Sequence, residues 1–152
     1  MSFDRLLGNF YKVSTHQFTH EEDRILRQDL LEDFDKGILK CLVAIKCLDE
    51  GVDVPSSQTA FFMSNSTNPR EFIQRRGRVL RKSPGKEFAH LYDFLAVPPI
   101  TPDMDLFEMN KGIIKKELAR FFLFSKHSQN KYQAQAKIWD IAKQYKIFDF
   151  ED

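Results

Sequence analysis

The sequence has little cysteine, no long apolar run and almost no net charge. Its two cysteines, Cys41 and Cys47, are too few for a disulfide framework, and their spacing does not suit zinc. We therefore expect buried thiols in a reducing cytoplasm. The four histidines show no metal-ligand spacing, so no metal site is expected. No run of about 18 uncharged apolar residues occurs, and the N-terminus lacks a basic region followed by an apolar one. These absences predict neither a membrane partner nor secretion.

What is present is typical of a globular protein. Hydrophobic residues make up 42% of the chain and charged residues 30%. A length of 152 residues fits one domain, or one domain with a helical appendage. The 15 phenylalanines indicate that aromatic packing dominates the core, with some rings available to a partner surface.

Strand and helix patterns alternate over the first two thirds of the chain. Residues Phe10–Thr15 alternate apolar and polar side chains, which predicts a strand. A helix is expected next, with Thr19 as N-cap, Glu22 completing a capping box, and Gly37 at its end. Further strands are expected at residues 38–46, 59–64 and 87–94. This order predicts an α/β domain with a parallel sheet, which binds ligands beyond the carboxyl ends of its strands.

The last third of the chain reads as helix only. Helical spacing of apolar residues predicts two helices, at about residues 103–127 and 129–146. We therefore divide the chain into an α/β body, residues 1–100, and a helical extension, residues 101–152. The extension is expected to pack on the body through its Phe and Leu side chains.

The stretch REFIQRRGRVLRK gathers positive charge in a chain whose net charge is only +1. Pro69 is expected at the first helical position, after Asn68 as cap. On a helix over residues 69–82, Gln74, Arg78 and Arg81 lie within about 60° of one another. Such a stripe can bind phosphate oxygens through paired hydrogen bonds, whereas the plain alternative is a solvated arginine face.

Apolar residues on the opposite side of this helix are expected to anchor it on the sheet; they are Phe72, Ile73, Val79 and Leu80. A second polar group follows the strand LVAIK, where Asp49, Glu50 and Asp53 surround Gly51. Carboxylates at the end of a strand and arginines on a later helix predict mutual positioning across one cleft.

These two segments resemble motifs of a known family. LVAIKCLDEGVDVP is similar to motif V, and QRRGRVLR to the motif VI signature Q-x-x-G-R-x-x-R, of the second RecA-like domain of superfamily 2 helicases. The resemblance covers roughly residues 13–96 and is closest to the DEAD/DEAH-type branch that includes restriction motors and the XPB group. It implies a P-loop NTPase-like, RecA-like helicase C-terminal domain, N-terminally truncated, with the helical hairpin added. It also implies ATP-dependent helicase or translocase activity.

The resemblance assigns roles residue by residue. Arg81 matches the arginine finger that reaches the γ-phosphate of ATP, Arg78 the second motif VI arginine, and Gln74 the residue that opens the motif. Gly51 and Asp53 match the motif V pair near the nucleotide. DEAD-box relatives carry a strand-contacting threonine where this chain has Ile45, so Lys46 and the backbone beside it are the expected nucleic-acid contact.

The sequence contains no G-x-x-x-x-G-K-[ST] loop and no acidic D-E-x-[HD] box. The resemblance therefore assigns ATP with Mg²⁺ mainly to the N-terminal RecA-like domain of the same protein. The chain alone is expected to be inactive, with nucleic acid as partner (DNA favoured over RNA). Self-association is expected through the surface that the family's motif IV strand would cover. Two alternatives stay open: a non-catalytic nucleic-acid-binding module that uses the basic helix, and a degenerate partner-binding domain.

Overall fold

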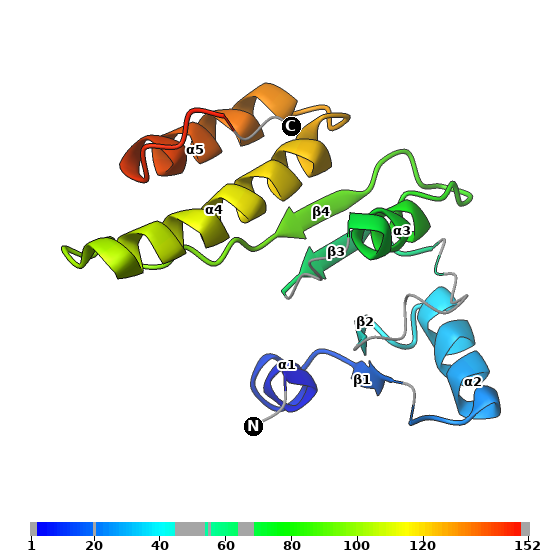
Figure 1. Cartoon of the computed structure of the whole chain (residues 1–152). Helices are drawn as coiled ribbons and strands as arrows, with labels where there is room; N and C mark the ends of the chain where they lie inside the picture. The colour runs from blue at the N-terminus through cyan, green and yellow to red at the C-terminus, as the bar shows by residue number, and fades with distance from the viewer. Residues whose placement is uncertain (1–2, 20, 45–53, 55, 64–68, 150–152) are drawn as a thin grey trace. The chain divides into compact units, whose positions relative to one another are not determined.

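The computed structural model describes residues 3–19, 21–44, 54, 56–63 and 69–149. In this part helices are interspersed with strands, β3 follows β2 directly in the order of described elements, and two helices come last, as predicted (Figure 1). The chain forms two compact units: Met1–Ala60 with Asn65–Tyr92, and Phe61–Ser64 with Asp93–Asp152. The elements are α1 (Phe3–Tyr11), β1 (Thr15–Phe18), α2 (Arg24–Asp35), β2 (Cys41–Ala44), β3 (Thr59–Phe62), α3 (Pro69–Val79), β4 (His90–Asp93), α4 (Met104–Ser125) and α5 (Lys131–Gln144).

The strands pair in parallel, as an α/β fold requires. β1 lies beside β2, with Thr15 opposite Cys41 at one end of the pair. β3 lies beside β4: His90 N–H donates to Gln58 O at 2.7 Å, and Phe94 N–H donates to Phe62 O at 3.2 Å. Both strands advance by four residues in the same direction between these bonds, so this pair is parallel too. The helix α3 is the crossover between β3 and β4, which confirms the predicted fold class.

The first predicted strand is wrong. Phe10 and Tyr11 end the helix α1 and are exposed, and the strand begins only at Thr15. The helix stops because Lys12 adopts a φ of 55° and Val13 N–H donates to Leu7 O at 3.2 Å. An alternation of apolar and polar residues this short does not distinguish a strand from a helix end.

The start of α2 also differs from the prediction. Asp23, not Thr19, is the N-cap, and its carboxylate accepts the Leu26 N–H at 2.8 Å. The predicted Thr19–Glu22 pair does form: the Glu22 carboxylate accepts the Thr19 N–H at 2.5 Å and the Thr19 hydroxyl at 2.7 Å. It closes the loop before the helix instead of capping the helix, because a better-placed carboxylate follows it.

The Thr19–Glu22 pair makes stability depend on pH. Burial raises the pKa of Glu22, but hydrogen bonds from Thr19 outweigh it, so the pKa lies below its ordinary 4.5. This stabilisation is present above the ordinary value and is lost as pH falls through the lowered one. We expect Glu22→Gln to cost about 1 kcal/mol of unfolding free energy at neutral pH.

Urea unfolding of wild type and variant from pH 7 to pH 3 checks this. The gap between the two should close as the pH falls below 4.5. Glu21→Gln is the control, because the Glu21 side chain is exposed. A Glu22→Gln cost that stays constant down to pH 3 would contradict the role given to the charge.

The end of α2 is as predicted. Gly37 has a φ of +72°, its N–H donates to Phe34 O at 3.0 Å, and Ile38 N–H donates to Asp33 O at 2.9 Å. This double closure is the Schellman arrangement, which favours glycine at the left-handed position. Leu30 of α2 and Phe18 of β1 form a small core, 6% and 1% exposed.

The helical extension has its own core and also forms as predicted. Asp103 caps α4, its carboxylate accepting the Leu106 N–H at 3.0 Å. α4 packs along α5 (Figure 1) around six buried residues: Ile114, Leu118, Ile138, Ala142, Tyr145 and Ile147. Tyr145 stacks on Phe107 with ring centroids 5.8 Å apart, and its hydroxyl donates to the Pro98 carbonyl.

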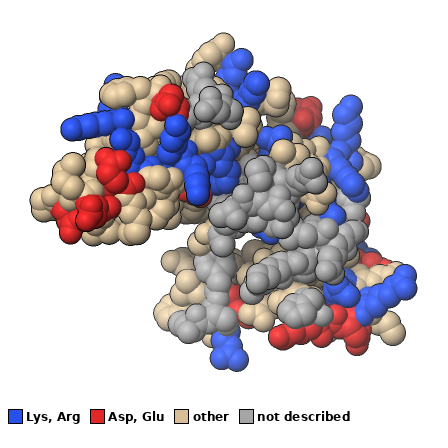
Figure 2. All heavy atoms as spheres, viewed as in Figure 1, with Lys and Arg blue, Asp and Glu red and all other residues tan. Residues whose placement is uncertain are grey.

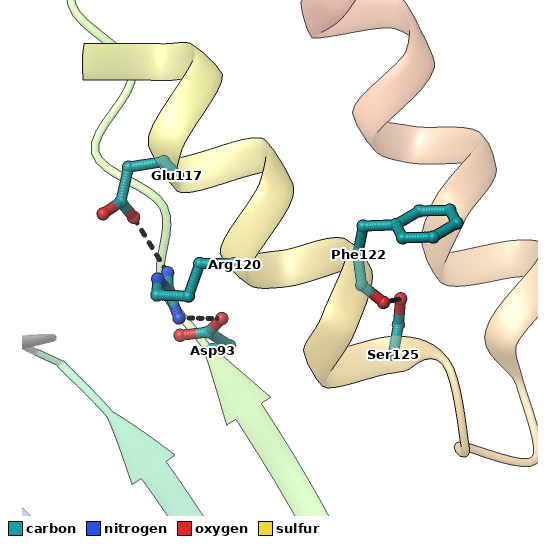
Figure 3. A network of polar contacts seen from close by, with 5 residues as sticks. All are labelled: Asp93, Glu117, Arg120, Phe122 and Ser125. Carbon is teal, nitrogen blue, oxygen red and sulfur yellow. Dashed lines mark hydrogen bonds and ion pairs between the residues drawn. The ribbon is translucent and has the colours of Figure 1, made fainter. Parts of the chain in front are cut away.

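A buried ion cluster joins α4 to the end of β4 (Figure 3). Arg120 donates to the Asp93 carboxylate at 2.7 Å and to the Glu117 carboxylate at 2.8 Å. The Asp93 side chain is 0% exposed and the Arg120 side chain 11%. Nearby, Phe124 of α4 meets Phe62 of β3 edge to face. These contacts lie within the second unit, at the ends of β3 and β4, and the expected packing of the extension on the α/β body stays a prediction.

The sequence predicts no membrane-spanning helix and no metal site, and the structure is informative on both points only for the described residues. None of the described helices has the length and apolar composition needed to cross a membrane. No group of three or more His, Cys, Asp or Glu in the described ranges could hold a metal ion. Cys41 is a half-buried free thiol, and Cys47 lies outside the described residues.

Candidate functional site

The arginine helix α3 begins at Pro69 as predicted but ends at Val79, before Arg81. Leu80 N–H still donates to Arg76 O at 3.1 Å, and Arg81 N–H donates to Arg78 O at 3.4 Å. A hydrogen-bonded turn that contains Leu80 and Arg81 therefore follows the helix. Two features end the helix. Pro84 disfavours helical conformation at the residue before it. Lys86 Nζ donates to Val79 O at 2.5 Å and satisfies a carbonyl at the helix end.

The predicted stripe is therefore partly helical. Gln74 and Arg78 lie one turn apart on the same face of α3. Arg81 belongs to the following turn, so its expected place on the helical wheel is wrong. Gln74 and Arg81 are exposed, while Arg78 is half-buried. The structure thus presents an amide and a guanidinium to solvent on either side of a more constrained second arginine.

The predicted apolar anchors of α3 are only partly correct. Val79 is 4% exposed and holds the C-terminal end of the helix. Ile73 and Leu80, expected to be buried, are 53% and 49% exposed. The side chain of Phe72 lies outside the described residues. Ile73 and Leu80 stay exposed because the β3–β4 pair is narrow. Two strands spaced about 5 Å apart offer too small a surface to bury a whole helix face.

Part of the basic run has a structural role that sequence analysis did not assign. Arg76 and Arg78 occupy the last turn of α3. Cations there stabilise the carbonyl end of a helix by about 0.3–1 kcal/mol each. Lys and Arg are also spread over the rest of the visible surface (Figure 2), so positive charge alone does not single out this helix. The spacing of the motif carries more information than its charge.

Gly77, in the middle of the motif, is not required by packing within the described part. A Cβ at this position meets no atom within 4 Å, and no positive φ is recorded for it. We expect Gly77→Ala to raise the unfolding free energy by about 0.5–1 kcal/mol, because alanine favours helix.

Chemical denaturation of the chain measures this gain. Gly37→Ala is the matched control and should lose about 1 kcal/mol, because Gly37 has a positive φ. A loss of stability in Gly77→Ala would show that a neighbour does occupy this space.

The motif V half of the predicted site lies outside the described residues. This applies to Gly51, Asp53, Lys46 and Ile45, so their position beside the arginines stays a prediction. The described flank is well fixed: Ser57 is buried, its N–H donates to Val54 O at 3.1 Å and its hydroxyl to Thr59 O at 3.2 Å. These bonds set the entrance to β3.

A hollow of about 530 Å³ lies beside the loop that follows the motif, lined by Gln58, Gly85, Lys86, Glu87, Phe88 and His90. It sits at the amino ends of β3 and β4. Ligands of parallel sheets bind at the opposite, carboxyl ends. We therefore assign the hollow no part in the site.

Comparison with known proteins shows which family the chain resembles. The model of the helicase conserved C-terminal domain matches residues 3–83. A DNA 3′-5′ translocase XPB2 of Sulfurisphaera tokodaii is 41% identical over 64 residues, 42% of this chain and 15% of that protein. A Dicer-like protein 2-2 of Aspergillus niger is 33% identical over 81 residues, 50% of this chain and 6% of that protein. The chain thus spans a small part of these relatives' length.

A solved structure agrees in fold. The C-terminal part of the Fun30 ATPase domain superposes with a TM-score of 0.53 at 12% identity, covering 81% of this chain and 44% of that one. The family model covers more than half of the chain and includes both predicted motifs. The chain therefore belongs to the helicase conserved C-terminal domain family of superfamily 2.

Proposed function

We propose that this chain is the C-terminal half of an ATP-dependent motor that moves along nucleic acid. Its part in catalysis is to supply Arg81 and Arg78 to ATP held mainly by the N-terminal RecA-like domain. The observation that carries the proposal is the Q-x-x-G-R-x-x-R spacing on α3 and the turn after it, within the matched residues 3–83.

The chemistry of these side chains suits a phosphoryl group. Phosphoryl transfer spreads negative charge over the transferred group, and a planar guanidinium donates two parallel hydrogen bonds to its oxygens. Arg81, exposed beyond the helix end, is not held to the helix geometry and suits the role of finger. Half-buried Arg78 suits a fixed second donor, and Gln74 a polar contact one turn earlier.

The remaining assignments concern the other ligands. Gly51 and Asp53 of motif V would line the nucleotide from this side. Mg²⁺, when bound, supplies charge neutralisation at the phosphates, and we assign it to the N-terminal domain. The nucleic acid would contact Lys46 and the backbone beside it. DNA is favoured over RNA because a relative is named a DNA translocase.

The proposal predicts that the 152-residue chain hydrolyses no ATP by itself, while the parent protein does so with stimulation by nucleic acid. A half-site without a phosphate cradle lacks the groups that position nucleotide and water. Phosphate release from ATP, measured with and without single-stranded DNA for the chain and for the parent protein, tests both predictions.

A parent protein that binds nucleic acid but never hydrolyses ATP would contradict the proposal and favour a binding module. Turnover by the chain alone would contradict the division of the site between two domains. A mock purification without the parent protein serves as the control for contaminating ATPase.

A further inference from the structure

A second group of basic side chains lies on the connection between α4 and α5, which we call the α4–α5 turn and define as residues 126–132. Lys126 and His127 are exposed, and Lys131 is half-buried in the first turn of α5. From Leu118 to Trp139 the chain contains no Asp or Glu. Nearby residues in the sequence therefore leave this positive charge uncompensated.

Three lysines of the same helices are paired with carboxylates, whereas Lys116 and Lys137, in the described part of the chain, are not. Each of the three paired lysines lies within 4 Å of a carboxylate oxygen: Lys111 with Glu108 (3.6 Å), Lys115 with Asp149 (3.2 Å) and Lys143 with Asp140 (3.8 Å). Within the described part of the chain, Lys126 and Lys131 take part in no such ion pair. The turn therefore differs from the rest of the hairpin in combining two such lysines with a stretch that has no acidic residue.

The amino end of α5 adds to this positive potential. Asn130 is the N-cap, but its side chain accepts no hydrogen bond from the helix, and the first turn has no acidic residue. Lys131 stands there instead, beside the positive end of the helix dipole, where a cation is unfavourable. A negatively charged partner would relieve this repulsion.

An aromatic ring stands beside these charges. Tyr132 is 76% exposed, and Lys131 Nζ lies 4.8 Å from its ring centroid. Exposed aromatic rings next to cations are the means by which proteins hold single-stranded nucleic acid, because bases stack on the ring while the cations contact phosphates. An acidic peptide would use the charges but not the ring.

Hydrogen bonds close the first part of the turn. Ser125 is 2% exposed, and its hydroxyl donates to Phe122 O at 3.1 Å (Figure 3). Ser128 donates to Ser125 O twice, from its N–H at 2.9 Å and from its hydroxyl at 2.8 Å. A fixed backbone lowers the ordering cost of binding.

We propose that the α4–α5 turn is a contact surface for single-stranded nucleic acid, separate from motifs V and VI. Lys126 and Lys131 bind backbone phosphates, and Tyr132 stacks on a base. The choice of nucleic acid as partner rests on the proposed function. The surface itself rests on the charges, the ring and the hydrogen-bonded turn.

Binding of fluorescein-labelled oligothymidylate to the 152-residue chain, measured by anisotropy over a salt series, tests the proposal. Lys126→Ala with Lys131→Ala should weaken binding about tenfold at low salt. The slope of log affinity against log salt should fall by about 1.4, because each lysine that neutralises a phosphate of a single strand contributes about 0.7. Tyr132→Ala should weaken binding about fivefold or more, whereas Tyr132→Phe should keep it, because stacking needs only the ring.

The matched control is Lys115→Ala with Lys143→Ala, which removes the same charge from the same helices and should change affinity less than about twofold. An equal effect in the control, unchanged binding in the Lys126 and Lys131 variant, or no binding by the wild type at low salt overturns the proposal. An effect confined to the lysines, with Tyr132→Ala unchanged, overturns the stacking role of Tyr132. None of these outcomes touches the assignment of Arg81, which is measured by ATP turnover.

Discussion

Replacing Arg81 by alanine in the parent protein is expected to abolish ATP hydrolysis while leaving ATP binding almost unchanged. The nucleotide is held mainly by the other domain, so removal of one distant donor costs little in the ground state. In the transition state the missing guanidinium leaves developing charge unpaired. Arginine fingers of nucleotide hydrolases contribute on the order of 10³ to 10⁵ in turnover. ATPase turnover at saturating ATP and nucleic acid, together with the dissociation constant for ATP, measures both effects.

Two further variants make this prediction specific. Arg81→Lys should recover little turnover, because a point ammonium does not reproduce the planar fork. Arg75→Ala should cost far less, because Arg75 leaves α3 about 100° around the helix from Gln74. If Arg75→Ala is as damaging as Arg81→Ala, the finger has been assigned to the wrong arginine.

Replacing Arg120 by alanine is expected to produce the largest loss of stability, about 3–5 kcal/mol. The Asp93 side chain is 0% exposed, and the substitution removes the guanidinium that lies 2.7 Å from its carboxylate. Unfolding free energy from chemical denaturation, followed by circular dichroism, measures the loss. Since Asp93 and Arg120 belong to the same unit as α4 and α5, the loss should appear in the helical signal.

An exposed ion pair provides the control for Arg120. Lys143 and Asp140 lie 3.8 Å apart with 70% and 79% exposed side chains, so Lys143→Ala should cost at most about 0.5 kcal/mol. Arg120→Met with Asp93→Leu should recover most of the stability, because an apolar pair leaves no buried charge. A cost for Arg120→Ala as small as that for Lys143→Ala would show that the ion cluster is solvated.

Features with a local chemical signal could be predicted from the sequence. Gly37, Pro69 and the two long helices lie where turn chemistry and apolar spacing predicted them. The end of α3 was predicted too late, although Pro84 carried the signal: the apolar pair Val79–Leu80 prolonged the helical pattern past the real end. Short elements were predicted least accurately, because the residues Phe10 and Tyr11 suit a strand and a helix end equally well.

Contacts between distant residues left no such signal. Arg120 and Asp93 are 27 residues apart, and neither is unusual in its surroundings. The lysines of the α4–α5 turn were equally hidden, because a sequence shows where acidic residues are absent but not which lysines find ion-pair partners through folding. The motif VI spacing was informative for the opposite reason: its four positions lie within eight residues, so one helix and one turn keep them together.

The most direct test of the central claim compares two ligands in the parent protein. ATP is the ground-state ligand, and ADP with aluminium fluoride resembles the transition state of phosphoryl transfer. If Arg81 acts mainly in the transition state, Arg81→Ala should change ATP affinity less than about threefold but weaken the transition-state analogue by about 100-fold or more. An equal reduction in affinity for both ligands, or no reduction for either, would contradict the account.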